Sequence, residues 1–142
     1  MGYEAEQRLD ASNMKFGVLV VREFEEFVML ELPALIDSLA SAGCMPQNIE
    51  VREVATTSDV VMATHFFAEY TDVDGVVILA PENRLMSSIP VMNGIVQLQV
   101  QWNMVIVAGD SKRAMHAVEL VTMQNEMEVE AAERGQGQRG IS

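Results

Sequence analysis

Two short segments carry the side chains whose types and spacing could do chemistry. Thr56-Thr57-Ser58-Asp59 offers hydroxyls and backbone N–H groups at a helix start, which suit sugar hydroxyls or an anion and equally suit a plain helix cap. Glu82-Asn83-Arg84 offers a general acid, an amide and a cation, with Ser87 nearby as a hydrogen-bond donor. A solvated turn explains the second segment equally well, so neither segment by itself names a reaction.

The other reactive residue types give weaker signals. His65 and His116 fall inside expected helices, where an ordinary helix histidine is commoner than a ligand. Cys44 is the only cysteine, which excludes an intrachain disulfide or a Cys-rich zinc cluster and fits a reducing compartment. No catalytic residue is assigned, and we expect neither a metal nor a cofactor.

Charge and motifs exclude several functional classes. The chain has 142 residues, with 9 Lys and Arg against 21 Asp and Glu, a net charge of -12 that disfavours nucleic acid and anionic membranes but not a small anion. No glycine-rich dinucleotide motif follows a strand, and no phosphate-loop motif exists. The polar N-terminus does not resemble a signal peptide, and the longest apolar runs are strand-sized, so we predict a cytoplasmic protein without membrane contact.

Hydrophobic periodicity predicts alternating strands and helices. The expected strands cover residues 15–21, 49–54, 75–80 and 104–109. The first helix is expected over residues 30–42, starting near Glu31 so that Pro33 falls in its first turn, with Gly43 as its stop. A second helix follows a cap at Ser58 or Asp59, and a last helix runs to about residue 132.

Four β-α repeats predict the fold class. The economical solution is α/β, a flavodoxin-like three-layer α/β/α sandwich around a four-stranded parallel sheet, formed by one domain over residues 14–132. Residues 1–13 and 133–142 are expected to be peripheral or flexible tails. Ligands in such sheets lie beyond the carboxyl ends of the strands, which places the expected site at residues 22–25, 55–59, 81–88 and 109–111.

The order of elements and several strings resemble 6,7-dimethyl-8-ribityllumazine synthase, the penultimate enzyme of riboflavin biosynthesis. The resemblance spans residues 15–132. Lys15-Phe16-Gly17-Val18-Leu19-Val20-Val21-Arg22 is similar to the first strand of that family and its arginine. Gly94-Ile95-Val96-Gln97-Leu98-Gln99-Val100 is similar to its Gly-Ile-Met-Gln-Val-Gln-Leu helix, and the strand after it also fits.

The resemblance implies a lumazine-synthase-like fold, a homo-oligomer that is a pentamer or a larger shell, and a ribityl, flavin-like or phosphate-bearing ligand. It implies substrate-binding positions in three segments: Arg22 and Phe24; Thr56, Thr57, Ser58 and Asp59; and Glu82, Asn83, Arg84 and Ser87. The chain departs from the family at most of these positions. Glu23 stands where the family has its stacking aromatic, and the proton-transfer histidine and two cations have no counterpart.

These departures favour a non-catalytic or repurposed homologue, which binds a flavin-like or ribityl ligand or acts in oligomeric assembly. The alternative is an active synthase that condenses 5-amino-6-ribitylaminopyrimidinedione with 3,4-dihydroxy-2-butanone 4-phosphate through an imine. Glu82, Arg84 and Ser87 would then replace the histidine. A third possibility is a signalling module, like flavodoxins or response regulators, that shares only the strand order.

Overall fold

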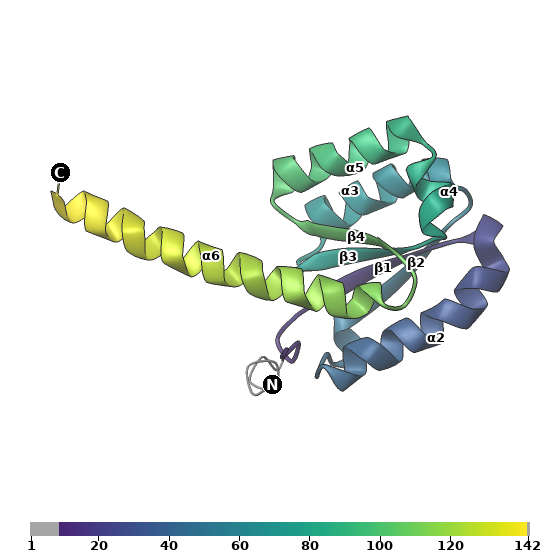
Figure 1. Ribbon diagram of the computed structural model, residues 1–142, viewed down its shortest axis with the longest axis horizontal. Helices are drawn as coiled ribbons and strands as arrows, with labels where there is room; N and C mark the ends of the chain where they lie inside the picture. Colours follow the sequence, from purple (N-terminus) through teal and green to yellow (C-terminus); the bar gives the residue numbers. More distant parts are fainter. Residues whose placement is uncertain (1–8, 142) are drawn as a thin grey trace.

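The computed structural model describes residues 9–141, with side chains to residue 135. Four strands alternate with helices along the chain (Figure 1). The strands are β1 (Phe16–Val21), β2 (Ile49–Val54), β3 (Gly75–Leu79) and β4 (Val105–Gly109). The helices are α2 (Glu25–Ser41), α3 (Val60–Tyr70), α4 (Glu82–Met86), α5 (Ile89–Trp102) and α6 (Arg113–Ile141), with short 3-10 turns η1 (Arg22–Phe24), η2 (Pro46–Asn48) and η3 (Thr57–Asp59).

The strands form one parallel sheet in the order β2-β1-β3-β4. β1 and β3 lie in the centre, and all their residues are buried because both of their faces are covered. β2 is an edge strand, and its charged side chains include the ion pair between Arg52 and Glu50 at 2.7 Å. The predicted four-stranded parallel sheet and flavodoxin-like α/β fold are therefore confirmed.

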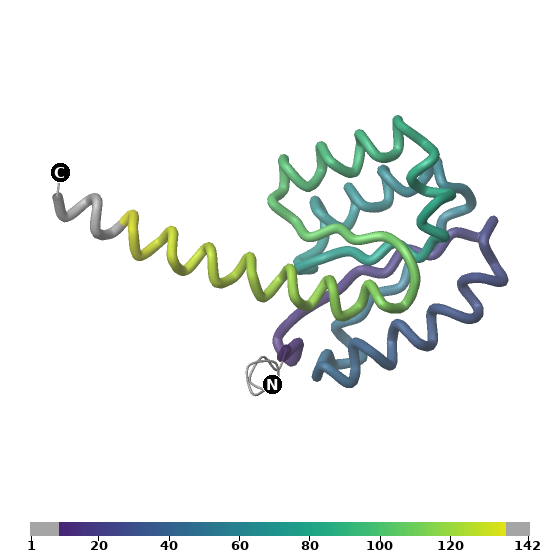
Figure 2. Tube along the Cα trace, viewed as in Figure 1, coloured from purple at the N-terminus to yellow at the C-terminus, as the bar shows by residue number. Residues whose placement is uncertain are grey.

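Helices cover both faces of the sheet. Figures 1 and 2 show α2 and α6 on one side and α3 and α5 on the other. Alternate strand residues point to opposite sides, so Phe16, Val18 and Val20 pack with α2 and α6, whereas Leu19 and Val21 pack with α3 and α5. This alternation divides the core into two apolar layers with the sheet between them.

Two glycines allow α3 to pack closely against its neighbours. A Cβ on Gly17 of β1 would lie 2.7 Å from the Phe67 ring of α3. A Cβ on Gly94 of α5 would lie 2.8 Å from a methyl group of Val61, also on α3. Both contacts are shorter than a carbon–carbon contact allows, so the layer of α3 and α5 depends on glycine at these positions.

The first helix begins earlier than predicted. α2 starts at Glu25 instead of near Glu31, and Pro33 lies inside it. Proline removes the hydrogen bond to the carbonyl group of Met29, but Met29 and Leu30 are exposed on this turn, so water can reach the freed carbonyl. Phe27, Val28 and Leu32 pack on the core and hold the extra turns in place.

Asp59 is the N-cap residue of α3, one of the two predicted positions, but its side chain makes no hydrogen bond to the α3 backbone. The Asp59 carboxylate instead reaches back to Thr56, the N-cap residue of η3, and accepts hydrogen bonds from the Thr56 backbone N–H at 3.0 Å and hydroxyl at 3.1 Å. Asp59 thus closes a capping box as its third residue. The next predicted loop, which starts at Pro81, contains the short helix α4.

Residues just outside the range 14–132 also contact the body of the protein. Ala11 is fully buried and its N–H donates to the carbonyl group of Ala42 at 2.7 Å, and Leu9 packs against the same core. At the other end α6 continues past residue 132 to Ile141 and extends away from the sheet (Figure 1). Residues 1–8 of the predicted N-terminal tail lie outside the described residues.

No described helix combines the length and hydrophobicity needed to cross a membrane.

Candidate functional site

The carboxyl ends of the strands gather all the sequence-predicted site residues at one end of the sheet. Arg22 and Phe24 follow β1 in η1, Thr56 to Asp59 follow β2, and Glu82 to Ser87 follow β3 in and just after α4. β1 and β3 are neighbours, and the helices after them cover opposite faces of the sheet. The crevice at such a switch point is the usual ligand position in open α/β sheets.

Four side chains at this end form a connected group, which we call the Phe24 cluster: Glu23, Phe24, Thr57 and Arg84. One carboxylate oxygen of Glu23 accepts hydrogen bonds from the Thr57 hydroxyl at 2.6 Å and from its backbone N–H at 3.0 Å. The Arg84 guanidinium lies over the Phe24 ring, 5.3 Å from its centroid. Phe24 itself is buried in the apolar layer beneath α3 and α5.

The electrostatics of this cluster favour an ionised Glu23. The hydrogen bonds from Thr57 lower the pKa of the Glu23 carboxyl below its ordinary value of 4.5, and the charge of Arg84 lowers it further. A carboxylate held in this state is a hydrogen-bond acceptor and a poor proton donor near neutral pH. The cluster therefore suits binding better than general acid catalysis.

The remaining predicted residues have other partners. Arg22 pairs at 2.7 Å with Glu53 of β2, which is not part of the Phe24 cluster. Thr56 and Asp59 bond one another in the capping box, and the Ser87 hydroxyl donates to the carbonyl group of Arg84 at 2.8 Å. Ser58 and Asn83 are exposed.

A second group, the Arg113 cluster, joins the predicted residue Glu82 to Arg113 and His116, which were not predicted as site residues. Arg113 at the start of α6 lies 3.4 Å from a carboxylate oxygen of Glu82 and 3.4 Å from Nδ1 of His116. A guanidinium only donates hydrogen bonds, so Nδ1 accepts and the proton of a neutral ring is on Nε2. The spacing of three residues, which puts Arg113 and His116 on one helix face, was the signal available in the sequence.

Hollows of modest size accompany these groups. A trough of about 350 Å³ runs along β4 between α5 and α6, with Glu82, Arg113 and His116 at its polar end and mainly apolar side chains elsewhere. Hollows of about 330 Å³ and 270 Å³ lie beside Arg22 and beside Lys112. The volumes of 350 and 330 Å³ fall at the lower end of the range for small-molecule sites, about 300–1,000 Å³, and the volume of 270 Å³ falls below it.

No family model and no curated protein matches this chain. Among the described residues, no three His, Cys, Asp or Glu side chains come together as metal ligands. The two clusters and the surfaces around them are therefore the features that bear on the function of this chain.

Proposed function

We propose that the protein is a non-catalytic lumazine-synthase-like homologue that acts in homo-oligomeric assembly. Three observations support this proposal. The sheet order agrees with the fold that the resemblance implies, the strand-end side chains bind one another, and α5 presents an exposed apolar face. The strand-end contacts support the absence of catalysis, and the exposed face of α5 supports a role in assembly.

The strand-end contacts occupy the groups that a substrate would need. In the resemblance the stacking position falls on Glu23, so only a shifted Phe24 could stack on a pyrimidine, and the guanidinium of Arg84 covers the Phe24 ring. Thr57 stands in the segment that would hold a ribityl chain, but its hydroxyl and N–H are both donated to Glu23. A substrate would have to break these contacts, and it would find neither the family's histidine nor its two cations. Binding would therefore lose free energy to the broken contacts, and no histidine would transfer the proton.

The exposed face of α5 suits contact between subunits. Ile89, Val96 and Val100 have 71%, 51% and 80% of their surface exposed, and intervals of seven and four residues put them on one face. Val91, Ile95 and Leu98 on the opposite face are buried against the sheet. Exposed Asn93 lies between Ile89 and Val96, but α5 contains no charged residue, and a largely apolar exposed face of this kind is typical of a contact between two bodies.

The catalytic part is tested by following dimethylribityllumazine formation optically with both substrates present, against a protein-free control. We expect the rate with protein to equal the unaided rate. A rate clearly above the control, lost in Glu82→Gln and Arg84→Ala but kept in Arg52→Ala on the far strand edge, would instead establish an active synthase.

The assembly part is tested by native mass spectrometry and sedimentation. We expect the wild type to form an oligomer and Val100→Glu to dissociate it, because a charge in an apolar interface is left without a partner. Met62→Glu on α3 is the matched control, since Met62 is 72% exposed and lies on another helix. A wild-type mass equal to one chain would refute assembly.

A further inference from the structure

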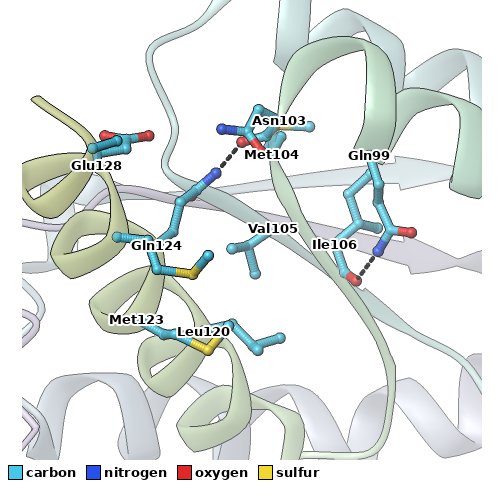
Figure 3. A pocket seen from close by; sticks show the side chains of 11 residues that line it. Gln99, Asn103, Met104, Val105, Ile106, Leu120, Met123, Gln124 and Glu128 are labelled. Atoms are coloured by element: carbon cyan, nitrogen blue, oxygen red, sulfur yellow. Dashed lines mark hydrogen bonds between the residues drawn. The ribbon is translucent and has the colours of Figure 1, made fainter. Parts of the chain in front are cut away.

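A cavity lies at the amino end of β4, at the end of the sheet opposite the Phe24 cluster. We call it the β4 groove; its volume is about 470 Å³, and its lining includes Met104, Val105, Leu120, Met123, Met127 and Glu128. Figure 3 shows Leu120, Met123 and Gln124 of α6 on one side, Gln99 on the other and Val105 between them. Three methionines give the groove a polarisable and adaptable lining, which is typical of surfaces that bind helices.

Side chains already hydrogen-bond some of the backbone carbonyl groups at the groove that an added β-strand would need. The Gln99 side chain donates to the carbonyl group of Ile106 at 3.0 Å, and the Gln124 side chain donates to that of Asn103 (Figure 3). Pairing with another strand uses the free carbonyl groups of an edge strand, and two carbonyl groups beside this groove already have side-chain donors. A ligand that binds through side chains, such as a helix, fits better than a strand.

The α6 wall of the groove continues beyond the sheet. Leu120, Met123, Met127 and Ala131 follow at intervals of three and four residues and share one face of α6. Leu120 packs against the core, whereas Met123 and Met127 are 49% and 59% exposed. The 29 residues of α6 span about 43 Å, so its apolar face extends beyond the body of the protein.

The charge around this apolar face is negative. Glu128 lines the groove, and Glu126, Glu130 and Glu133 are exposed on the same part of α6, with Arg134 as the cation there. The whole chain carries a net charge of -12, so a second copy would bring like charges to this surface. Complementarity favours a basic partner.

From these observations we propose that the β4 groove binds a basic amphipathic helix of a partner protein. The apolar side chains of that helix would fill the methionine-lined groove, and its Lys or Arg residues would face Glu128 and the neighbouring glutamates. This proposal is independent of the assembly role of α5, because Ile89, Val96 and Val100 are not part of the groove.

The test uses the full chain and a synthetic peptide of about 16 residues, or four to five helical turns, with Leu on one face and Lys on the other. A scrambled peptide of the same composition and one with Glu in place of Lys are the controls. Binding is followed by the fluorescence of Trp102, the only tryptophan, which directly precedes groove residue Asn103, and by methionine methyl NMR. We expect only the basic amphipathic peptide to bind and to shift the Met123 and Met127 methyl signals.

Variants then locate the binding surface. We expect Met123→Ser/Met127→Ser to weaken peptide binding by at least about tenfold, and Met62→Ser on α3 to leave binding unchanged. Raising the salt concentration from about 50 to about 500 mM should also weaken binding, because the charges are exposed. Circular dichroism and the unfolding midpoint check that each variant is folded.

Three outcomes would overturn the proposal. Equal binding of the scrambled peptide would show general charge attraction, and unchanged binding by Met123→Ser/Met127→Ser would place the peptide elsewhere. If this double variant lost the wild-type oligomer, the groove would bind a second copy of the chain. Loss of the oligomer only in Val100→Glu would instead agree with a groove that binds a partner helix.

Discussion

Glu23 shows how one strand-end residue depends on a partner far along the chain. Its carboxylate is bound by the hydroxyl and N–H of Thr57, which lowers the pKa of Glu23 below 4.5. The protonated form of Glu23 is thereby disfavoured in the folded state. Between the folded and the unfolded pKa, the unfolded chain therefore binds more protons than the folded protein. Glu23 therefore contributes stability above its unfolded pKa, and that contribution is lost as the pH falls through the lower folded value.

Thr57→Val should weaken this effect. Removing the hydroxyl takes away the largest cause of the lowered pKa and keeps the backbone hydrogen bond, so we expect the pKa of Glu23 to rise part of the way toward 4.5. The decline of stability as the pH falls below 4.5 should become shallower. Carboxyl NMR titration and acid unfolding measure the two changes, with Ser58→Ala as the neighbouring control. An unchanged titration midpoint would contradict the role given to the Thr57 hydroxyl.

Cys44 is a second residue whose surroundings decide its chemistry. It is 3% exposed, its thiol lies 3.5 Å from the carbonyl oxygen of Met14, and burial raises the pKa of the thiol above 9.0. The thiolate is the reactive form, so we expect slow modification by an aromatic disulfide reagent at pH 8 and fast modification after unfolding. Fast labelling of the folded protein would show that this site opens readily.

At the scale of elements, α2 carries a proline in its interior. Pro33 is exposed, so its ring makes little contribution to the core, and it removes a helix hydrogen bond. We expect Pro33→Ala to raise the free energy of unfolding by about 1–3 kcal/mol, reduced somewhat by the greater freedom of the unfolded chain. Chemical denaturation measures this change, with Asp37→Ala one turn later as a control. A lower stability would show that the proline has a packing role.

The contact between β1 and α3 gives the opposite expectation. Gly17→Ala would put a methyl group 2.7 Å from the Phe67 ring, which must move in a close-packed layer, so we expect a loss of about 1–3 kcal/mol. Gly135→Ala on α6 is the matched control, because its added methyl group would meet no atom within 4 Å. The control should be neutral or slightly stabilising in the same denaturation experiment. Equal effects at the two positions would refute the close-packing argument.

At the scale of the whole molecule, the fold and the distal part of α6 are separable. Val121 is the last buried residue among the described side chains, and residues 125–134 are all exposed. We therefore expect truncation after Asn125 to change the free energy of unfolding by less than about 1 kcal/mol and to keep a single cooperative transition. The truncated chain lacks Met127 and Glu128, so it should also lose peptide binding. A large loss of stability would mean that distal α6 supports the core.

The elements were predictable because their signals are local. Strands buried on both faces need continuous apolar runs, and residues 16–21, 75–79 and 105–109 supply them. The carboxyl-end position of Phe24, Thr57 and Glu82 also followed, because parallel strands end at the same edge of the sheet. The start of α2 was missed because a proline in a first turn and a proline in an exposed interior turn leave similar patterns.

The connections between these elements were decided only in the tertiary structure. Glu23 meets Thr57 across 34 residues, Glu82 meets Arg113 across 31, and Glu31 accepts the Ser111 N–H across 80. Such pairs depend on which strands are neighbours and on how each helix lies over the sheet. Periodicity records which face of an element is buried but not what lies against it. The sequence by itself therefore determined the layers and the end of the sheet where side chains gather, and packing of the layers decided which side chains meet.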